Sequence, residues 1–141
     1  MVNRNITKVI SVKNLSEIFG ENIVTDFIPL DNYQAVDFIV ASGTGEAAEI
    51  TVSAAAKSGE VGTEIQIPLR KVNAASDIIY IEREDTLSIG GEGGSLAAYR
   101  VNAVDLAKSG SDRAALKLTA AAGSTVSGCI IAVLSQARYT E

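Results

Sequence analysis

The stretch AEITVSA, residues 48–54, decides the fold, because apolar and polar side chains alternate along it. Ile50 and Val52 fall on one side of an extended chain, and the residues between and beside them are polar. A period of two residues is typical of a β-strand with one buried face and one face in water. The stretch therefore predicts a strand at the surface of a β-rich domain.

Two further segments alternate in the same way. In TEIQIPL, residues 63–69, both isoleucines and Leu69 fall on one side, which predicts a single strand. In ITKVISV, residues 6–12, the alternation is rougher because Lys8 shares a side with apolar residues, but the pattern still favours a strand over a helix. The prolines, Pro29 and Pro68, cannot donate a ladder hydrogen bond, so each is expected at a strand end or an edge.

Two segments are apolar on both faces, YQAVDFIVA at residues 33–41 and GCIIAVL at residues 128–134. Such runs are typical of central strands, or of strands whose second face is covered by a partner. Between the apolar segments lie the turn-rich pieces ASGTGEA, KSGEVGT, IGGEGGS, AKSGSD and AAGST. Their spacing of roughly ten to twenty residues predicts one all-β domain over residues 1–141, an antiparallel β-sandwich or β-barrel of jelly-roll-like kind with little helix. Residues 1–22 are a candidate for an extended N-terminal arm.

The segment LAAYRVNAVDLAKSG, residues 96–110, fits two structures. It could form a helix with Ser95 as N-cap and Gly110 as C-terminal stop. It could instead form the strand AYRVNAV with a bulge before Val104. The β-branched residues Val101 and Val104 favour the strand.

Two other segments have uncertain secondary structure. In DRAALKLTAAAG, residues 112–123, the alanines suit a helix, whereas Leu116 and Leu118 alternate with polar residues as in a strand. The segment NLSEIFGE, residues 14–21, is expected to form one helical turn.

Composition excludes several partners. The chain has 141 residues, with 12 basic and 17 acidic side chains and a net charge of −5, so it lacks the basic surface that phosphate binding requires. No stretch approaches the roughly 20 apolar residues of a membrane span, and the N-terminus lacks the apolar core of a secretory signal. We therefore expect a soluble protein made in the cytoplasm that binds neither nucleic acid nor a membrane.

The residue types needed for common catalytic and metal sites are missing. The chain has no histidine, which removes the usual base of a nucleophile triad and a usual zinc ligand. Its one cysteine, Cys129, stands in an apolar run and is expected to be a small buried hydrophobe. These observations predict a protein that binds or assembles rather than an enzyme, with no catalytic residues, no metal site and no cofactor.

Two polar segments could suggest ligands. SIGGEGGSLA, residues 88–97, is rich in glycine, but it lacks the Lys-Ser/Thr pair of a phosphate loop and the spacing of a dinucleotide fingerprint. It is expected to be a turn whose glycines adopt positive φ angles. EREDT, residues 82–86, could offer oxygen ligands to a divalent cation, but its spacing matches no calcium loop, so a solvated strand end is favoured.

The sequence resembles a family of small virion structural proteins encoded in the capsid modules of tailed bacteriophages, over roughly residues 30–139. Members of that family carry a segment of the form Y-Q-x-V-x-F-x-V-x-x-G and a final apolar strand that ends in an A-R-Y motif. The matching residues here are Tyr33, Gln34, Val36, Phe38, Val40, Gly43, Ala137, Arg138 and Tyr139.

The resemblance implies a head decoration protein on the outer capsid surface of the virion, with the major capsid protein as its partner. It would act as a homo-oligomer, and a trimer would suit the local threefold positions of a shell. We expect Ile131, Val133 and Tyr139 at the oligomer or capsid interface.

Two other functions stay open. One is another virion part, such as a head completion, tail or fibre-base protein. The other is a carbohydrate-binding or adhesive β-sandwich, whose aromatic platform would have to come from Tyr33, Tyr80, Tyr99 or Tyr139.

Overall fold

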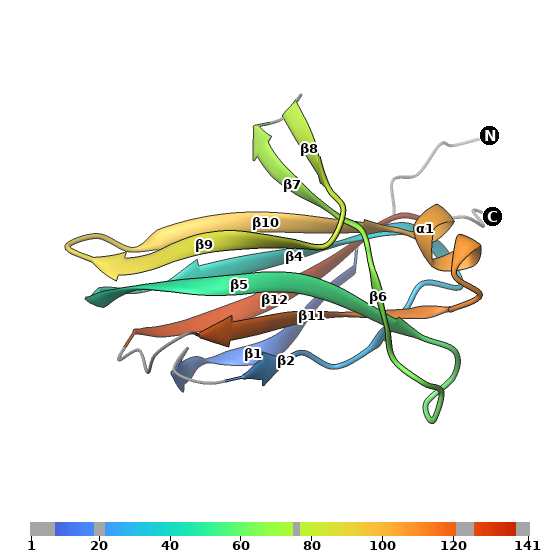
Figure 1. Cartoon of the computed structure of the whole chain (residues 1–141), viewed down its shortest axis with the longest axis horizontal. Helices are drawn as coiled ribbons and strands as arrows, with labels where there is room; N and C mark the ends of the chain where they lie inside the picture. The colour runs from blue at the N-terminus through green and yellow to red at the C-terminus, as the bar shows by residue number, and fades with distance from the viewer. Residues whose placement is uncertain (1–7, 19–21, 75–76, 121–125, 138–141) are drawn as a thin grey trace.

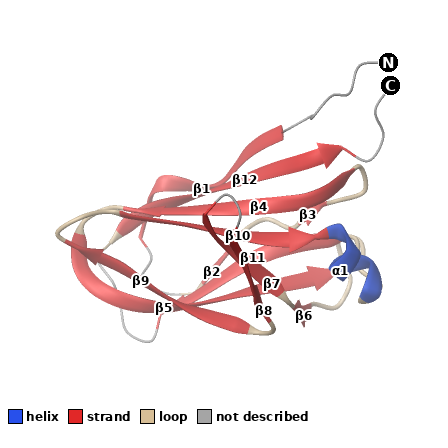
Figure 2. Cartoon of the chain, turned by 90° about the horizontal axis from the view of Figure 1, so that it is seen from above, coloured by secondary structure: helices blue, strands red, loops and turns tan. Residues whose placement is uncertain are grey.

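The computed structural model describes residues 8–18, 22–74, 77–120 and 126–137, and it confirms an all-β fold. Two antiparallel sheets pack face to face, as Figures 1 and 2 show from two directions. The two sheets form separate hydrogen-bonded ladders, so the domain is a β-sandwich rather than a closed barrel.

The first sheet has six strands in the order β1-β12-β4-β10-β7-β8. The two segments that are apolar on both faces form β4 and β12, which lie side by side in its interior, as predicted. The strands are β1 (Lys8–Ile18), β4 (Tyr33–Ser42), β7 (Leu69–Ala74), β8 (Asp77–Ile81), β10 (Ser95–Asn102) and β12 (Ser127–Ala137).

The second sheet is built around one long strand, β5, which contains the AEITVSA stretch. β11 pairs with one edge of β5, and β6 and β9 pair with successive parts of the other edge. Two short strands, β2 and β3, pair with the far side of β11, and Pro29 ends β3 at this edge as expected. The strands are β2 (Ile23–Val24), β3 (Ile28–Pro29), β5 (Gly45–Lys57), β6 (Ile65–Ile67), β9 (Glu84–Gly91) and β11 (Arg113–Ala120).

The hydrophobic core lies between the sheets and is supplied by alternate residues of both. Ile50 and Val52 are buried, as their alternation predicts. They meet Phe38 and Tyr99 from the first sheet and Leu116 from the neighbouring strand, all in one cluster. Each fully buried side chain of this size contributes about 1.5–3 kcal/mol relative to exposure, so this layer is the main source of stability.

The predicted single strand over TEIQIPL is wrong, because the segment divides at Pro68. β6 ends at Ile67 in the second sheet, and β7 begins at Leu69 in the first. Pro68 has no N–H to donate, so neither ladder continues through it. Ile67 and Leu69 are buried as predicted, but Ile65 is 39% exposed.

The strand predicted through AYRVNAV is correct only as far as Asn102. From there the chain forms a short helix, α1 (Ala103–Lys108), which closes one end of the sandwich (Figure 1). Val104 therefore lies on a helix and not beside a bulge, because burying Ala103 and Leu106 requires helical spacing. Gly110 follows the helix with a φ of 76°, whereas Ser95 belongs to β10 and caps nothing.

The structure also decides the two segments of uncertain secondary structure. Residues 113–120 form strand β11, in which Leu116 and Leu118 point into the core. The helical turn expected over residues 14–21 is wrong for residues 14–18, which belong to β1, and residues 19–21 lie outside the described part. β1 takes the extended form because its backbone pairs with β12. Of the candidate N-terminal arm, residues 8–18 form this strand and residues 1–7 are not described.

Within the segment SIGGEGGSLA, residues 92–94 form the turn between β9 and β10, and Gly90 and Gly91, the last two residues of β9, have φ angles of 85° and 92°. The prediction of positive φ angles is therefore confirmed at these two positions. No helix in the described ranges is long and apolar enough to cross a membrane.

Candidate interaction surface

The outer faces of the two sheets differ in chemistry. Across the second sheet, a row of three threonines, Thr86, Thr51 and Thr119, lies on neighbouring strands. Two residues further along β5, Ser53 lies opposite Lys117, so the neighbouring row on this face is also polar. This is the ordinary outer face of a sandwich in water.

The outer face of the first sheet is apolar at its centre. Ala98, Ile39 and Ile131 form one row across β10, β4 and β12. A parallel row consists of Leu96, Ala41 and Cys129. We call this surface the apolar face; it comprises Ile39, Ala41, Val72, Leu96, Ala98, Cys129, Ile131 and Val133.

Two of the three predicted interface residues lie together on the apolar face. Ile131 and Val133 point away from the core on β12 and are half-buried. Cys129, two residues earlier, is also half-buried, so the expectation that it is a fully buried hydrophobe is wrong. It alternates with the core residue Ile130 and therefore points outward. Tyr139 lies outside the described residues.

One ion pair interrupts the apolar face. Arg100 on β10 donates two hydrogen bonds to Asp37 on β4, from Nε to Oδ1 at 2.7 Å and from Nη2 to Oδ2 at 3.0 Å. The hydrogen bond to Asp37 raises the pKa of Arg100 further above its already high ordinary value. The contact is bidentate, so each charge has a partner and the pair can be buried in an interface without leaving a charge unpaired.

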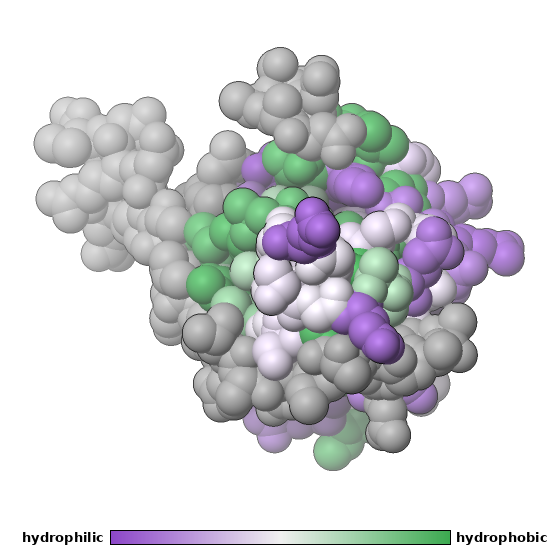
Figure 3. Space-filling view, turned by 90° about the vertical axis from the view of Figure 1, so that its left-hand side faces the viewer, coloured by the Kyte–Doolittle hydropathy of each residue, from purple (hydrophilic) through white to green (hydrophobic). Residues whose placement is uncertain are grey.

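The β7–β8 hairpin projects from the sandwich (Figure 1). It exposes large apolar side chains. Ile78 is 44% exposed, Ile79 47% and Tyr80 53%, and Leu96 on nearby β10 is 74% exposed. Figure 3 faces the end with the β9–β10 turn and shows hydrophobic surface along the top, on the hairpin side. Our sequence interpretation missed this hairpin, although Ile78–Ile81 is also a run apolar on both faces.

A partly buried polar contact anchors the base of the hairpin. Asp85 on β9 accepts a hydrogen bond from the Tyr99 hydroxyl at 3.0 Å, and it pairs with Lys71 on β7 at 3.1 Å. Burial, the negative charge of Asp85 and this hydrogen bond all raise the pKa of Tyr99. The predicted solvated strand end holds for Glu82 and Glu84, which are exposed, but Asp85 points between the sheets.

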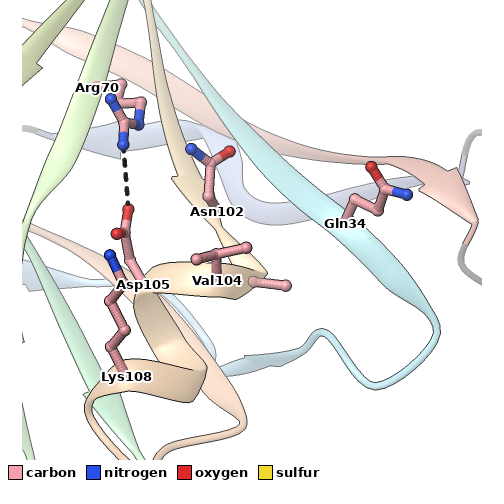
Figure 4. Close-up of a pocket in the computed structure, with 7 residues that line it drawn as sticks. Gln34, Arg70, Asn102, Val104, Asp105 and Lys108 are labelled. Atoms are coloured by element: carbon pink, nitrogen blue, oxygen red, sulfur yellow. Dashed lines mark ion pairs between the residues drawn. The ribbon is translucent and has the colours of Figure 1, made fainter.

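An open groove of about 850 Å³ lies where the hairpin meets α1 (Figure 4). Arg70 and Asp105 face each other there, with Nη2 and Oδ2 3.7 Å apart, which is longer than a hydrogen bond. Arg70 also stacks on the ring of Tyr80, 5.0 Å from its centroid. The lining residues are Gln34, Arg70, Asn102, Ala103, Val104, Asp105 and Lys108. None of these residues has a hydroxyl, thiol or imidazole side chain that could act as a nucleophile.

A sugar platform would have to be built without Tyr99. Tyr99 is fully buried, so its ring cannot receive a ligand. Tyr33 is half-buried, Tyr139 lies outside the described residues, and Tyr80 is 53% exposed with Arg70 over one face of its ring. Within the described part of the chain, no three Cys, Asp or Glu side chains gather closely enough to hold a metal ion.

These features define a small antiparallel β-sandwich with one polar and one apolar outer face. No protein-family model matches the sequence, and neither does any curated protein. Among solved structures, the SPBc2 prophage-derived protein YomS has a similar fold, with a TM-score of 0.56. The match covers 96% of this chain and 98% of that one at 6% sequence identity, so the likeness is one of fold.

Proposed function

We propose that the protein is a structural component of a bacteriophage virion, a head decoration protein that binds the outer surface of the capsid shell. The sequence resemblance to capsid-module proteins and the fold shared with a prophage-derived protein support a phage origin. The protein would be made in the host cytoplasm and act on the particle, with the major capsid protein as its partner.

The observation that carries this proposal is the contrast between the two outer faces. The polar face, with its threonine row, is suited to solvent, whereas Ile39, Ile131 and Val133 present apolar surface on the opposite side. A sheet exposed to water on its outer side normally carries polar residues there. The apolar face therefore fits a surface that is covered in the assembled state.

The apolar face would be buried against a sister subunit, with Ile131 and Val133 at the contact and Tyr139 at its end. A homotrimer matches the local threefold positions of a shell. Many copies that bind assembled lattice better than free shell protein stabilise the lattice by mass action. Such a role needs neither catalysis nor a cofactor, and it involves neither nucleic acid nor a membrane.

The test is to mix the purified protein with bare capsids and measure the copies bound per particle after pelleting. We expect saturation at a number set by the threefold positions of the shell, together with capsids that resist heating better. Capsids that pellet without the protein would contradict a decoration role. Binding to isolated tails instead would assign the protein to the tail.

A further inference from the structure

The outer edge of β8 is a free sheet edge. β8 pairs with β7 through four consecutive residues, from Leu69 opposite Ile81 to Val72 opposite Ile78. It is the last strand of the first sheet, and no described strand pairs with its other edge. In an antiparallel strand, alternate residues direct their backbone N–H and C=O groups to each side. The outer edge of β8 therefore offers hydrogen-bonding groups to a further strand.

Apart from Asp77 at its start, the sequence of β8 has no charge or proline that protects this edge. Natural edge strands are usually blunted by charges, proline, bulges or a covering segment. Residues 78–81, IIYI, are all apolar or aromatic and of high β propensity. Ile78 and Tyr80 point to one side of the hairpin and Ile79 to the other, and all three are about half exposed. Both faces of the strand, as well as its edge, are thus open to a partner.

A second copy of the same strand fits this edge. In an antiparallel pair related by a twofold axis at Ile79, Ile79 lies opposite Ile79 of the second copy. Ile78 then lies opposite Tyr80 of the second copy, and Tyr80 opposite its Ile78. Pairs of an aromatic and a β-branched residue stabilise antiparallel ladders, and no like charges face each other at these positions. With the axis at Ile79 all five residues of β8 are paired, and Asp77 lies opposite Ile81 of the second copy. Moving the axis to Tyr80 would leave Asp77 without a partner in β8. It would also place Ile78 opposite Glu82, so the register at Ile79 is favoured.

We propose that two copies of this protein associate by antiparallel pairing of their β8 strands around Ile79, which joins their first sheets into one continuous sheet. This contact is separate from the apolar face and does not depend on the decoration role proposed above. A pairing of this length buries less than the roughly 800 Å² per partner of a standard interface. We therefore expect a reversible association that grows with protein concentration.

The test uses the free protein without capsids, in sedimentation velocity over a series of concentrations. Ile79→Lys and Ile79→Glu each place like charges opposite each other, so each variant alone should show no species larger than the trimer of the apolar face and lose the association through β8. An equal mixture of the two variants should regain it, because Lys and Glu then lie opposite each other. Ile65→Lys is the matched control, since Ile65 is 39% exposed on strand β6 of the other sheet, and it should associate like the wild type.

Circular dichroism of each variant verifies that the sandwich is intact, which the exposure of Ile79 leads us to expect. A wild-type protein that shows no species larger than the trimer of the apolar face at any concentration would overturn the proposal. So would a mixture that associates no better than the single variants. If Ile79→Lys leaves free association unchanged but abolishes capsid binding, β8 pairs with the shell protein and not with a second copy.

Discussion

Asp85 shows how one residue can tie together parts of the molecule that are distant in sequence. It belongs to the second sheet, yet its carboxylate contacts Tyr99 and Lys71, both of the first sheet. Because Lys71 lies in β7, one of the two strands of the hairpin, the contact also holds the base of the hairpin against the second sheet. A carboxylate in this position is tolerated because a hydroxyl and an ammonium group both reach it.

We predict that Tyr99→Phe lowers the free energy of unfolding by roughly 1.5–3 kcal/mol near neutral pH, because a hydrogen bond to a charged group is lost. The folded state also raises the pKa of Tyr99 above its ordinary value of about 10. A raised pKa contributes stability that is present below pH ~10 and is lost as the pH rises further. Urea unfolding at a series of pH values should therefore show a steeper alkaline loss for the wild type than for Tyr99→Phe.

Tyr80→Phe serves as the control, since it removes an exposed hydroxyl and should keep the wild-type pH profile. Equal alkaline slopes for the wild type and Tyr99→Phe would show that the phenol does not contribute in this way.

At the scale of elements, the end of β9 that leads into the β9–β10 turn depends on two adjacent glycines for different reasons. Both have positive φ angles. A Cβ added to Gly90 would lie 2.7 Å from the carbonyl oxygen of Glu46 and 2.7 Å from Cγ2 of Val126, whereas one added to Gly91 would meet nothing within 4 Å. Gly90 is therefore needed for its lack of a side chain as well as for its conformation.

We predict that Gly91→Ala costs about 1–2 kcal/mol, the price of a left-handed conformation for alanine. Gly90→Ala should cost about 1–3 kcal/mol more, because the added methyl group also overlaps its neighbours. Chemical denaturation of the two variants measures the difference directly. Equal losses would mean that the turn relaxes and that only the backbone conformation matters.

At the scale of the whole molecule, the apolar face and the β8 edge are the two surfaces that we propose for self-association. The apolar face lies over the middle of the first sheet, and β8 lies at its edge. A threefold contact at the apolar face and a twofold contact at β8 can together link copies into a continuous lattice over a shell. Each surface can be removed by a substitution that leaves the other intact.

We predict that Ile131→Asp abolishes the trimer, because a carboxylate at the centre of the apolar face would be desolvated in the contact. Sedimentation should then show no species larger than the β8-paired dimer, while circular dichroism shows a folded sandwich. Thr51→Asp makes the same change in charge on the polar face and should leave the trimer intact. A trimer that survives Ile131→Asp would place its interface elsewhere.

The sequence by itself determined the all-β class, the central strands β4 and β12 and the core residues of β5. These follow from alternation along a few neighbouring residues, which is a local property. The change of sheet at Pro68, the helix after Asn102 and the inward turn of Asp85 were decided by the tertiary structure. Each depends on which distant strand lies beside the segment and on which backbone groups that strand hydrogen-bonds. Patterns among neighbouring residues in the sequence do not reveal this pairing. The same reason explains why the outward position of Ile131 could be predicted from the sequence, whereas the free edge of β8 became visible only once the strand order was known.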